Sequence, residues 1–367
     1  MHITQRLLIA STQLLFIGQA ILAAEDTLSI EIGGRLQVDA TSFDNDKFDY
    51  AGGGELRRGR LFVSGGLSEN WDYKLQVDFA PEEPELKDGY IRYHGFANAR
   101  ITMGNFKQFS SLEELTSSNN ISFSERSLAN ALVTGRRLGI GYQTWSDRFS
   151  LAASAYAHEA NNLVRGKGVS SRFVYRPPLG DGELVHLGIN LSREEDDDAR
   201  LRLRARPESH VDEHRIIDTG MIPGIESFNK IGFEAAYVNG RFSAQAEFVR
   251  QNLQRKLGSD LAFDGYYAYV SYFLTTDSRS YSTGDAIFTT VKPSSPRGAW
   301  EILARISHLD LNDKDITGGQ ADIVTVGVNY YVTDNLRLTA NYMMADSDQV
   351  AGNDDPNALQ LRMRFTF

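Results

Sequence analysis

The sequence predicts an all-β protein: a transmembrane antiparallel β-barrel of about 16 strands, with long extracellular loops and one loop folded into the lumen. Three observations support this prediction. Segments in which apolar and polar residues alternate recur along the chain, the connections between them are mostly short and long in turn, and the last segment ends on an aromatic residue. Lipid-facing and lumen-facing residues alternate in such barrels, so a mean hydropathy of −0.34 is compatible with a membrane protein.

The C-terminal segment 359–367 shows the pattern most clearly. Its odd positions, from Leu359 to Phe367, are all apolar, and its even positions are polar or charged, including Arg362 and Arg364. A period of two gives a strand one apolar and one polar face. The segment is also about as long as a tilted strand needs to be to cross a membrane. Two arginines on one face, with the chain terminus directly after, favour a barrel strand over the edge strand of a soluble sheet.

The first 24 residues have the features of a secretory signal peptide. Arg6 precedes two apolar runs, and small residues follow up to Ala24, although Leu22 stands where the cleavage site prefers a small residue. A single anchoring helix is the alternative, but polar residues at 11–13 interrupt the apolar run. We expect residues 1–24 to be removed on export to the bacterial outer membrane, which leaves one barrel domain at 25–367.

Composition narrows the expected partners. The formal net charge is −10 at pH 7 and becomes −11 without the signal peptide, which holds one arginine and no acid. Nucleic acid is therefore not an expected partner. The chain has no cysteine, which excludes disulfides and thiolate metal sites. We expect no cofactor and no metal.

Sixteen segments alternate in this way, and sixteen is even, as a single-chain bacterial barrel requires. The predicted strands are 28–40, 55–67, 71–80, 86–95, 98–105, 134–145, 148–158, 168–177, 184–193, 229–239, 241–251, 263–275, 297–308, 322–333, 335–345 and 358–367.

The connections between these segments give a second, independent signal. Links after even-numbered strands are mostly tight turns, such as Asn239-Gly240, whereas 41–54, 106–133, 194–228, 309–321 and 346–357 are long. Barrels of this class have short turns at one rim and long loops at the other. Two links differ: 81–85 is short, and 276–296 is either a long excursion at the short-turn rim or contains a missed pair of strands.

The faces of the strands opposite their apolar sides carry more cations than acids. Besides Arg35, Arg58 and Arg60, the cations predicted to face inward are Lys74, Arg92, Arg100, Arg137, Arg148, Arg172, Arg176, Lys230, Arg241, Arg305, Arg337, Arg362 and Arg364. Rings of arginine or lysine make pores favour anions. The alternative interpretation is that these arginines only neutralise inward acids and carboxylates at the rim.

Arg200, Arg202, Arg204 and Arg206 follow an acidic run at 194–198. At a period of two they would share one face of an extended segment, about 6.5–7 Å apart. Such a row can pass an anion from one guanidinium to the next without trapping it. Alternatively, the arginines pair with the adjacent acids, which are otherwise expected to be solvated loop surface.

The long link 106–133 is expected to fold inward and narrow the bore, since loops of this length in compact domains are usually functional. Its segment 109–115 predicts a short helix after a serine cap.

The chain resembles the phosphate-selective porin O and P family over essentially its whole mature length. The resemblance rests on the order of several pieces: GGRLQVD at 33–39, ELRRGRL at 55–61, WDYKLQVDF at 71–79, KDGYI at 87–91, LTSS at 115–118, SER at 124–126, GRFSAQAE at 240–247 and GYY at 265–267. It implies a trimeric sixteen-stranded outer-membrane channel with an anion-selective bore lined by arginines.

The resemblance also implies roles for individual residues. The family's arginine row is matched by Arg200, Arg202, Arg204 and Arg206, and its wall arginines by Arg35, Arg58 and Arg60. Ser117, Ser118 and Arg126 match positions that supply anion-binding groups at the constriction.

One departure concerns phosphate. Phosphate-specific members carry lysines that flank the Thr-Ser-Ser piece, whereas this chain has Glu114 and Asn119. A carboxylate there repels each unit of phosphate charge by about 4 kcal/mol at about 4 Å, unless an arginine pairs with it. The resemblance therefore implies the architecture, but it does not carry phosphate selectivity over.

The sequence thus favours a passive outer-membrane channel for small anions, with phosphate or polyphosphate among the candidates. The expected partners are small anions, outer-membrane lipid and lipopolysaccharide, and two further copies of the chain in a homotrimer. A general diffusion porin without anion specificity is the alternative. A barrel enzyme is a further one, although the histidines lie near no evident serine motif. A soluble secreted β-protein, such as a carbohydrate-binding module, is the third.

Overall fold

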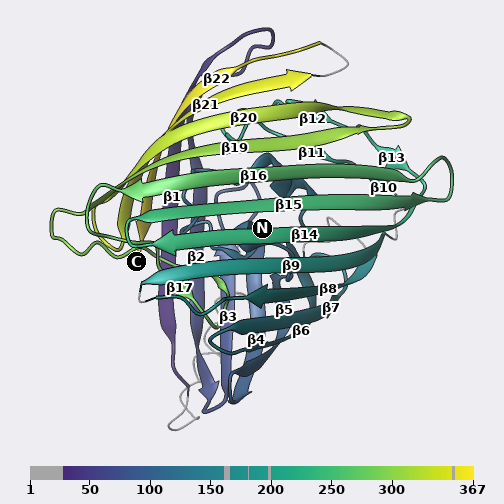
Figure 1. Cartoon of the computed structure of the whole chain (residues 1–367). Coiled ribbons are helices and arrows are strands. Elements are labelled where there is room, and N and C mark those ends of the chain that lie inside the picture. The colour runs from purple at the N-terminus through teal and green to yellow at the C-terminus, as the bar shows by residue number, and fades with distance from the viewer. Residues whose placement is uncertain (1–27, 161–165, 181, 197–199, 349–351) are drawn as a thin grey trace, which may run out of the picture.

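Sixteen strands form one closed antiparallel barrel in which each strand pairs with its neighbour in the chain and β1 pairs with β22 (Figure 1). The computed structural model describes residues 28–160, 166–180, 182–196, 200–348 and 352–367, so the predicted signal peptide lies outside the described residues. The wall strands are β1 (Glu31–Asp44), β2 (Gly53–Ser68), β3 (Trp71–Asp78), β4 (Glu85–Phe96), β5 (Ala99–Lys107), β6 (Arg136–Trp145), β7 (Phe149–Tyr156), β8 (Gly166–Tyr175), β9 (Glu183–Asp196), β14 (Ile225–Asn239), β15 (Phe242–Arg255), β16 (Leu261–Phe273), β19 (Ala299–Asp313), β20 (Ile316–Tyr331), β21 (Leu336–Asp348) and β22 (Asn357–Thr366).

All sixteen predicted segments correspond to wall strands, but the predicted long link 309–321 is wrong. β19 and β20 continue as a paired ribbon to Asp313 and Ile316, and only two residues connect them. In this extension the outward face carries polar residues, while the inward face buries Leu309 and Leu311 in an apolar cluster with residues of the segment after β9. The pattern of an apolar outer and a polar inner face therefore stops before the strands end. The predicted solvated acidic run is also partly wrong: Glu194 belongs to β9, is buried, and pairs with Lys230 and Arg137.

Closure of the barrel joins the two ends of the chain. β1 and β22 pair from Arg35 opposite Thr366 to Asp44 opposite Asn357, and the backbone N–H of Gly34 donates to the carbonyl of Phe367 at 3.0 Å. On the inner side, Arg362 donates to both carboxylate oxygens of Asp39, and neither side chain is exposed. This charge-assisted pair lies across the closing seam.

The strands separate lipid-facing from lumen-facing residues as alternation predicts. Leu359, Leu361, Met363 and Phe365 are exposed on the outer wall, while Arg362 and Arg364 between them are enclosed. Arg148 and Arg241 differ from the prediction, because both lie in short turns and are exposed.

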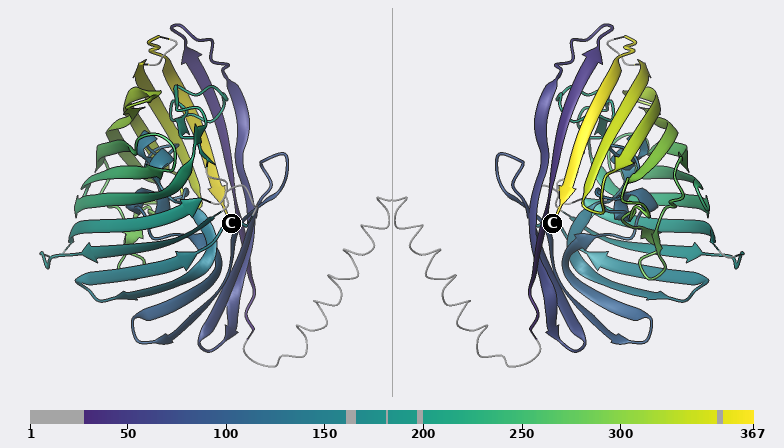
Figure 2. Two further views of the ribbon diagram at one scale, coloured as in Figure 1. Left: turned by 90° about the vertical axis from the view of Figure 1, so that its right-hand side faces the viewer. Right: turned by 90° about the vertical axis from the view of Figure 1, so that its left-hand side faces the viewer.

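Three segments leave the wall and fold into the barrel (Figure 2). The link 108–135 carries the helix α2 (Leu112–Leu115) and the 3-10 helix η1 (Leu128–Leu132). The second segment follows β9 and holds the short strands β10 (Arg200–Leu201), β11 (Arg204–Ala205), β12 (Ile217–Asp218) and β13 (Ile222–Pro223). Its buried residues pack with those of η1 in one apolar cluster.

The third segment, 274–298, accounts for the unassigned link at the short-turn rim. It contains β17 (Tyr281–Ser282) and β18 (Ile287–Phe288), which pair only with each other among the described strands and do not enter the wall. Arg172 of β8 donates to the carbonyl of Ala286 at 2.9 Å, and Arg100 of β5 pairs with Asp285. These contacts hold the segment inside the barrel.

None of the helices in the described part of the chain is long and apolar enough to cross a membrane.

The outward placement of Leu361 predicts that Leu361→Arg costs about 2–4 kcal/mol of unfolding free energy, because it puts a cation near the middle of the bilayer. Leu361 is 49 % exposed on the outer wall. The measurement is reversible chemical unfolding in lipid vesicles. Leu257→Arg, in the exposed turn between β15 and β16, is the matched control and leaves stability unchanged. Equal losses in the two variants would contradict the assignment of faces.

Candidate functional site

The loop between β5 and β6, residues 108–135, crosses the lumen and is fixed to the opposite wall. We call it the constriction loop. Ser111 caps α2, since its Oγ accepts from the backbone N–H of Glu114 at 3.1 Å, as the serine-cap prediction requires. The N–H groups of Leu112 and Glu113 donate to the carboxylate of Glu247 on β15 at 3.0 and 2.7 Å. A carboxylate at a helix N-terminus satisfies donors that have no partner within the helix.

Arg126 and Lys107 fix the C-terminal side of α2. Arg126 donates to the carbonyls of Glu113, Glu114 and Thr116, and both cations pair with the carboxylate of Glu114, at 3.1 and 3.5 Å. Burial alone would raise the pKa of Glu114, but the charges of Arg126, Lys107 and Arg136 outweigh it and lower the pKa to about 2. The carboxylate that the sequence placed at the constriction is therefore neutralised by cations from the wall and from its own loop.

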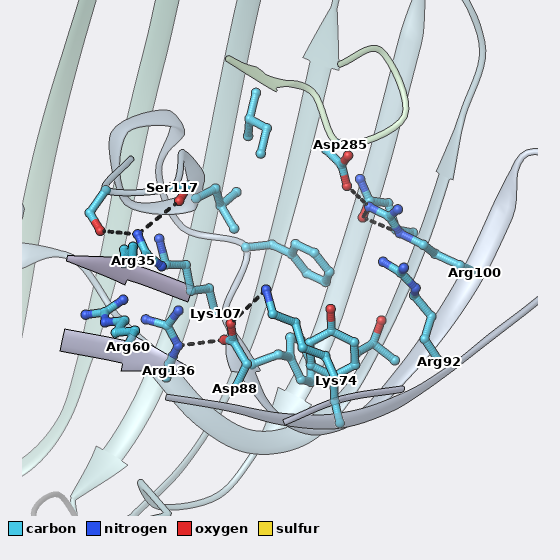
Figure 3. A pocket seen from close by; sticks show the side chains of 18 of the residues that line it. Arg35, Arg60, Lys74, Asp88, Arg92, Arg100, Lys107, Ser117, Arg136 and Asp285 are labelled. Atoms are coloured by element: carbon cyan, nitrogen blue, oxygen red, sulfur yellow. Dashed lines mark hydrogen bonds and ion pairs between the residues drawn. The ribbon is translucent and has the colours of Figure 1, made fainter. Parts of the chain in front are cut away.

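A cavity of about 350 Å³ lies between this loop, segment 274–298 and the wall strands β1 to β6. We call it the constriction cavity. Arg35, Arg60 and Arg136 lie on one side of it, and Arg92 and Arg100 on the other (Figure 3). Its lining is Arg35, Arg60, Lys74, Asp88, Tyr90, Arg92, Arg100, Thr102, Phe106, Lys107, Phe109, Leu115, Ser117, Ser118, Arg126, Arg136, Gln143, Asp285 and Ile287.

The lining has an excess of positive charge. Eight of its side chains are cationic and two are carboxylates. Three more carboxylates, Asp72, Asp78 and Glu114, pair with these cations from outside the lining, which leaves an excess of three positive charges. In pores generally, rings of arginine or lysine are how anions are favoured over cations.

Arg35 differs from the other seven cations of this lining. Each of those seven forms an ion pair with a carboxylate, whereas Arg35 forms none with the described residues. It donates instead to the hydroxyls of Ser118 at 2.8 Å and Ser117 at 3.4 Å, and to Gln76 at 3.4 Å. The structure thus brings together Arg35, Ser117 and Ser118, three residues that the sequence singled out from distant positions.

A second cavity, of about 270 Å³, lies beside the first, and Arg126 lines both. Arg57, Arg58, Arg204 and Arg206 also line it, together with Glu125 and Glu208. Burial alone would raise the pKa of Glu125, but Arg57, Arg58 and Arg362 surround it and lower the pKa well below its ordinary value.

The four predicted row arginines lie in the inward segment after β9, but not on one continuous strand. β10 pairs with β13 and β11 with β12. Between these two short ladders the carbonyl of Leu203 accepts from the backbone N–H of Thr219 at 2.9 Å. Arg204 and Arg206 line the second cavity, and Arg202 lines a third, of about 180 Å³. Arg202 pairs with Asp218, and Arg200 is exposed and lines none of the three cavities.

The remaining predicted residues do not line the first cavity. Arg58 donates to Gln37 at 2.7 Å and pairs with Glu125 at 3.3 Å. Arg362 pairs with both Asp39 and Glu125, and Arg364 donates to the carbonyl of Asn119 at 2.8 Å. Arg362 and Arg364 therefore hold the constriction loop against the closing seam of the barrel.

Sequence reasoning missed part of the lining. It gave Lys74, Arg92 and Arg100 as inward cations without assigning them to the site, and it did not select Lys107 or Arg136. Arg136 and Arg137 are adjacent, and alternation places only one of two adjacent residues inside the barrel. In the structure Arg136 lines the first cavity and Arg137 lines the third. Asp285 comes from a segment that had no predicted position, so no signal in the sequence indicated it.

Comparison with known sequences gives a consistent result. A family model described as "Phosphate-selective porin O and P" matches residues 30–367. Porin O of Pseudomonas aeruginosa is 27 % identical over 400 aligned positions, which cover 95 % of this chain and 91 % of that protein. An uncharacterized protein of Caulobacter vibrioides is 32 % identical, covering 87 % of this chain and 69 % of its own length.

Solved structures share the fold at low sequence identity. An anion-selective porin from Comamonas acidovorans superposes with a TM-score of 0.62 at 12 % identity, covering 93 % of this chain and 100 % of that one. The trimer form of OmpT, an outer-membrane protein of Vibrio cholerae, gives a TM-score of 0.60 at 10 % identity with the same coverage.

The pairing of Asp285 with Arg100 predicts the effect of Asp285→Asn. Removing this carboxylate frees one guanidinium at the cavity, so the ratio of anion to cation permeability is expected to rise about twofold. The measurement is the reversal potential of the purified protein in a planar bilayer under a KCl gradient. Asp322→Asn on the outer wall is the control and leaves the ratio unchanged. A lower ratio in Asp285→Asn would show that Asp285 does not oppose anions.

The lowered pKa of Glu114 predicts how its influence depends on pH. A carboxylate with a depressed pKa contributes its ion pairs fully above its ordinary pKa of 4.5, and loses them only as pH falls towards about 2. Glu114→Gln frees Lys107 and Arg126, so the ratio of anion to cation permeability in this variant is expected to exceed that of the unmodified protein. The difference persists at about pH 3.5, where an unperturbed glutamate is mostly protonated. Loss of the difference at that pH would contradict the pairing.

Proposed function

Because the chain belongs to the phosphate-selective porin O and P family, we propose that it is an outer-membrane channel through which small anions diffuse passively in preference to cations. The family and the fold are those of porin channels, which are not enzymes. One observation carries the proposed preference for anions. The cations of the constriction cavity exceed by three the carboxylates that line it or pair with them, and Arg35 has no carboxylate partner among the described residues.

The proposed pathway follows the two adjoining cavities. An anion enters beside Arg204 and Arg206, passes Arg57 and Arg58, and reaches the constriction at Arg126. We propose that Arg35, Ser117 and Ser118 form the central binding position, with Arg60 next to it. Conduction requires that an anion bind well enough to enter and weakly enough to leave. Ion pairs of the surrounding cations with carboxylates supply that balance, because each paired cation attracts a passing anion less than a free one does.

The other predicted residues take supporting roles in this proposal. Arg200 and Arg202 raise the anion concentration at the outer mouth, while Arg362 and Arg364 hold the constriction loop in place. Phosphate remains within the proposed set of anions, since the pairing of Glu114 with Arg126 and Lys107 removes the repulsion expected from an isolated carboxylate. The Oδ1 of Asn119 accepts a hydrogen bond from the Nε2 of Gln37 at 3.4 Å, and Asn119 does not line the constriction cavity.

We also propose that the protein is exported with cleavage of residues 1–24 and assembles as a homotrimer in contact with outer-membrane lipid and lipopolysaccharide. The trimer form of the structurally similar OmpT supports this assembly. A general diffusion porin without anion preference is the alternative function, and it would give equal permeability to potassium and chloride after correction for mobility.

The test of the proposed function is the reversal potential in a planar bilayer under a KCl gradient. We expect a potential of the sign given by chloride permeation, and we expect Arg35→Gln to lower the chloride-to-potassium permeability ratio about threefold. Arg193→Gln is the matched control, because Arg193 is exposed on the outer wall and lies outside the pathway. A cation-selective potential in the unmodified protein would overturn the proposed function.

A further inference from the structure

The constriction cavity has apolar lining residues that a channel for inorganic ions does not need. Besides its charged residues, the lining includes Tyr90, Phe106, Phe109, Leu115 and Ile287. These five side chains come from three separate parts of the chain: the wall strands β4 and β5, the constriction loop, and the inward segment 274–298. Their convergence on one cavity is therefore a property of the folded barrel.

Four of these five apolar lining residues belong to a packed cluster. Phe106 and Phe109 pack on Ala152 of β7, with ring centroids of the two phenylalanines 6.2 Å apart, and Tyr90 and Leu115 pack against them. Tyr90, Leu115 and Ile287 are only half-buried, so they present apolar surface to the lumen. Apolar surface left in contact with water is unfavourable, and a solute that covers it gains free energy.

The apolar side chains lie close in sequence to the polar groups of the site. Leu115 precedes Ser117 by two residues, and the Ser117 hydroxyl accepts from Arg35. Ile287 follows Asp285 by two residues, and Asp285 pairs with Arg100. Leu115 thus lies beside the Arg35 position, and Ile287 lies near Arg100 on the opposite side of the same cavity. A solute that is held at Arg35 and the two serines and extends across the cavity would meet apolar surface from both inward segments.

We infer that the preferred solutes of this channel are organic anions with one carboxylate and an apolar body, of which benzoate is the simplest aromatic example. The inference rests on the proposed function and specifies its substrate class. The carboxylate binds Arg35 with the hydroxyls of Ser117 and Ser118, in the two-pronged geometry that guanidinium and carboxylate share. The ring lies against Leu115, Ile287 and the edge of the phenylalanine cluster.

The size of the cavity agrees with this assignment. A volume of about 350 Å³ lies within the range of small-molecule sites. Inorganic phosphate presents oxygen atoms in every direction and gains nothing from an apolar wall. A carboxylate with a hydrocarbon body can contact both the cationic and the apolar lining residues of the cavity.

The experiment compares benzoate with acetate, which has the same charge and almost no apolar body. Reversal potentials of the purified protein are measured in planar bilayers with sodium benzoate on one side and sodium acetate on the other. Benzoate diffuses more slowly in water, so a bore without apolar contact gives a benzoate-to-acetate permeability ratio below one. We expect a ratio above one.

The double variant Leu115→Asn with Ile287→Asn keeps side-chain size and removes the apolar contact. Its benzoate-to-acetate ratio is expected to fall about fivefold, a change typical of losing apolar contacts in a binding site. Val133→Asn is the matched control, since Val133 is a half-buried apolar residue of the same loop outside this cavity, and it leaves the ratio unchanged. Faster migration of the unboiled than of the boiled protein on gels confirms that the double variant folds as a closed barrel.

The outcomes separate the two proposals. A ratio below one in the unmodified protein, or a ratio that does not change in the double variant, overturns the inference while an anion-selective potential in KCl leaves the proposed function standing. A cation-selective potential in KCl overturns both. Equal loss of benzoate and acetate permeation in the double variant assigns the apolar residues to loop packing alone and also overturns the inference.

Discussion

The constraint on which this structure depends is that backbone N–H and C=O groups within the hydrocarbon of a membrane must be hydrogen-bonded inside the protein. A sheet meets this requirement only when it closes, and here the closing pair is β1 with β22. Closure forces the second face of every strand into an enclosed space. The lumen therefore receives whatever the polar face carries, including Arg35, Arg60 and Arg362. The permeation site that we propose follows from the same hydrogen bonds that make the barrel stable.

Enclosed charges are costly unless they are paired, and most inward cations of this barrel are paired with carboxylates. Arg60 with Asp78, Arg362 with Asp39 and Arg172 with Glu234 are examples in which both partners are largely buried. The interpretation that inward arginines neutralise inward acids is thus correct for many of them. The anion preference that we propose arises from the remainder, because a few cations in the constriction exceed the acids available to pair with them.

The wall also determines the shape of the bore by holding three inward segments. Glu247 of β15 accepts from the N-terminus of α2, Arg172 of β8 donates to the carbonyl of Ala286, and Arg305 of β19 pairs with Glu208 of the segment after β9. These contacts position polar and apolar side chains of the loops against the basic wall. The resulting cavity has charged and apolar lining residues together, and they come from the wall and from two of the inward segments.

The sequence by itself determined the sixteen strands, most of the short and long connections, and which face of each strand meets lipid, because a period of two is a local property of the chain. It also indicated the serine cap of α2 and the inward positions of Arg35, Arg58 and Arg60. Only the tertiary structure decided which of these cations has a carboxylate partner, since Asp78, Glu125 and Asp39 come from other strands or loops. It also decided that Asp285 and Ile287 reach the constriction, because their contacts join residues up to 185 positions apart. No local pattern encodes contacts of that range.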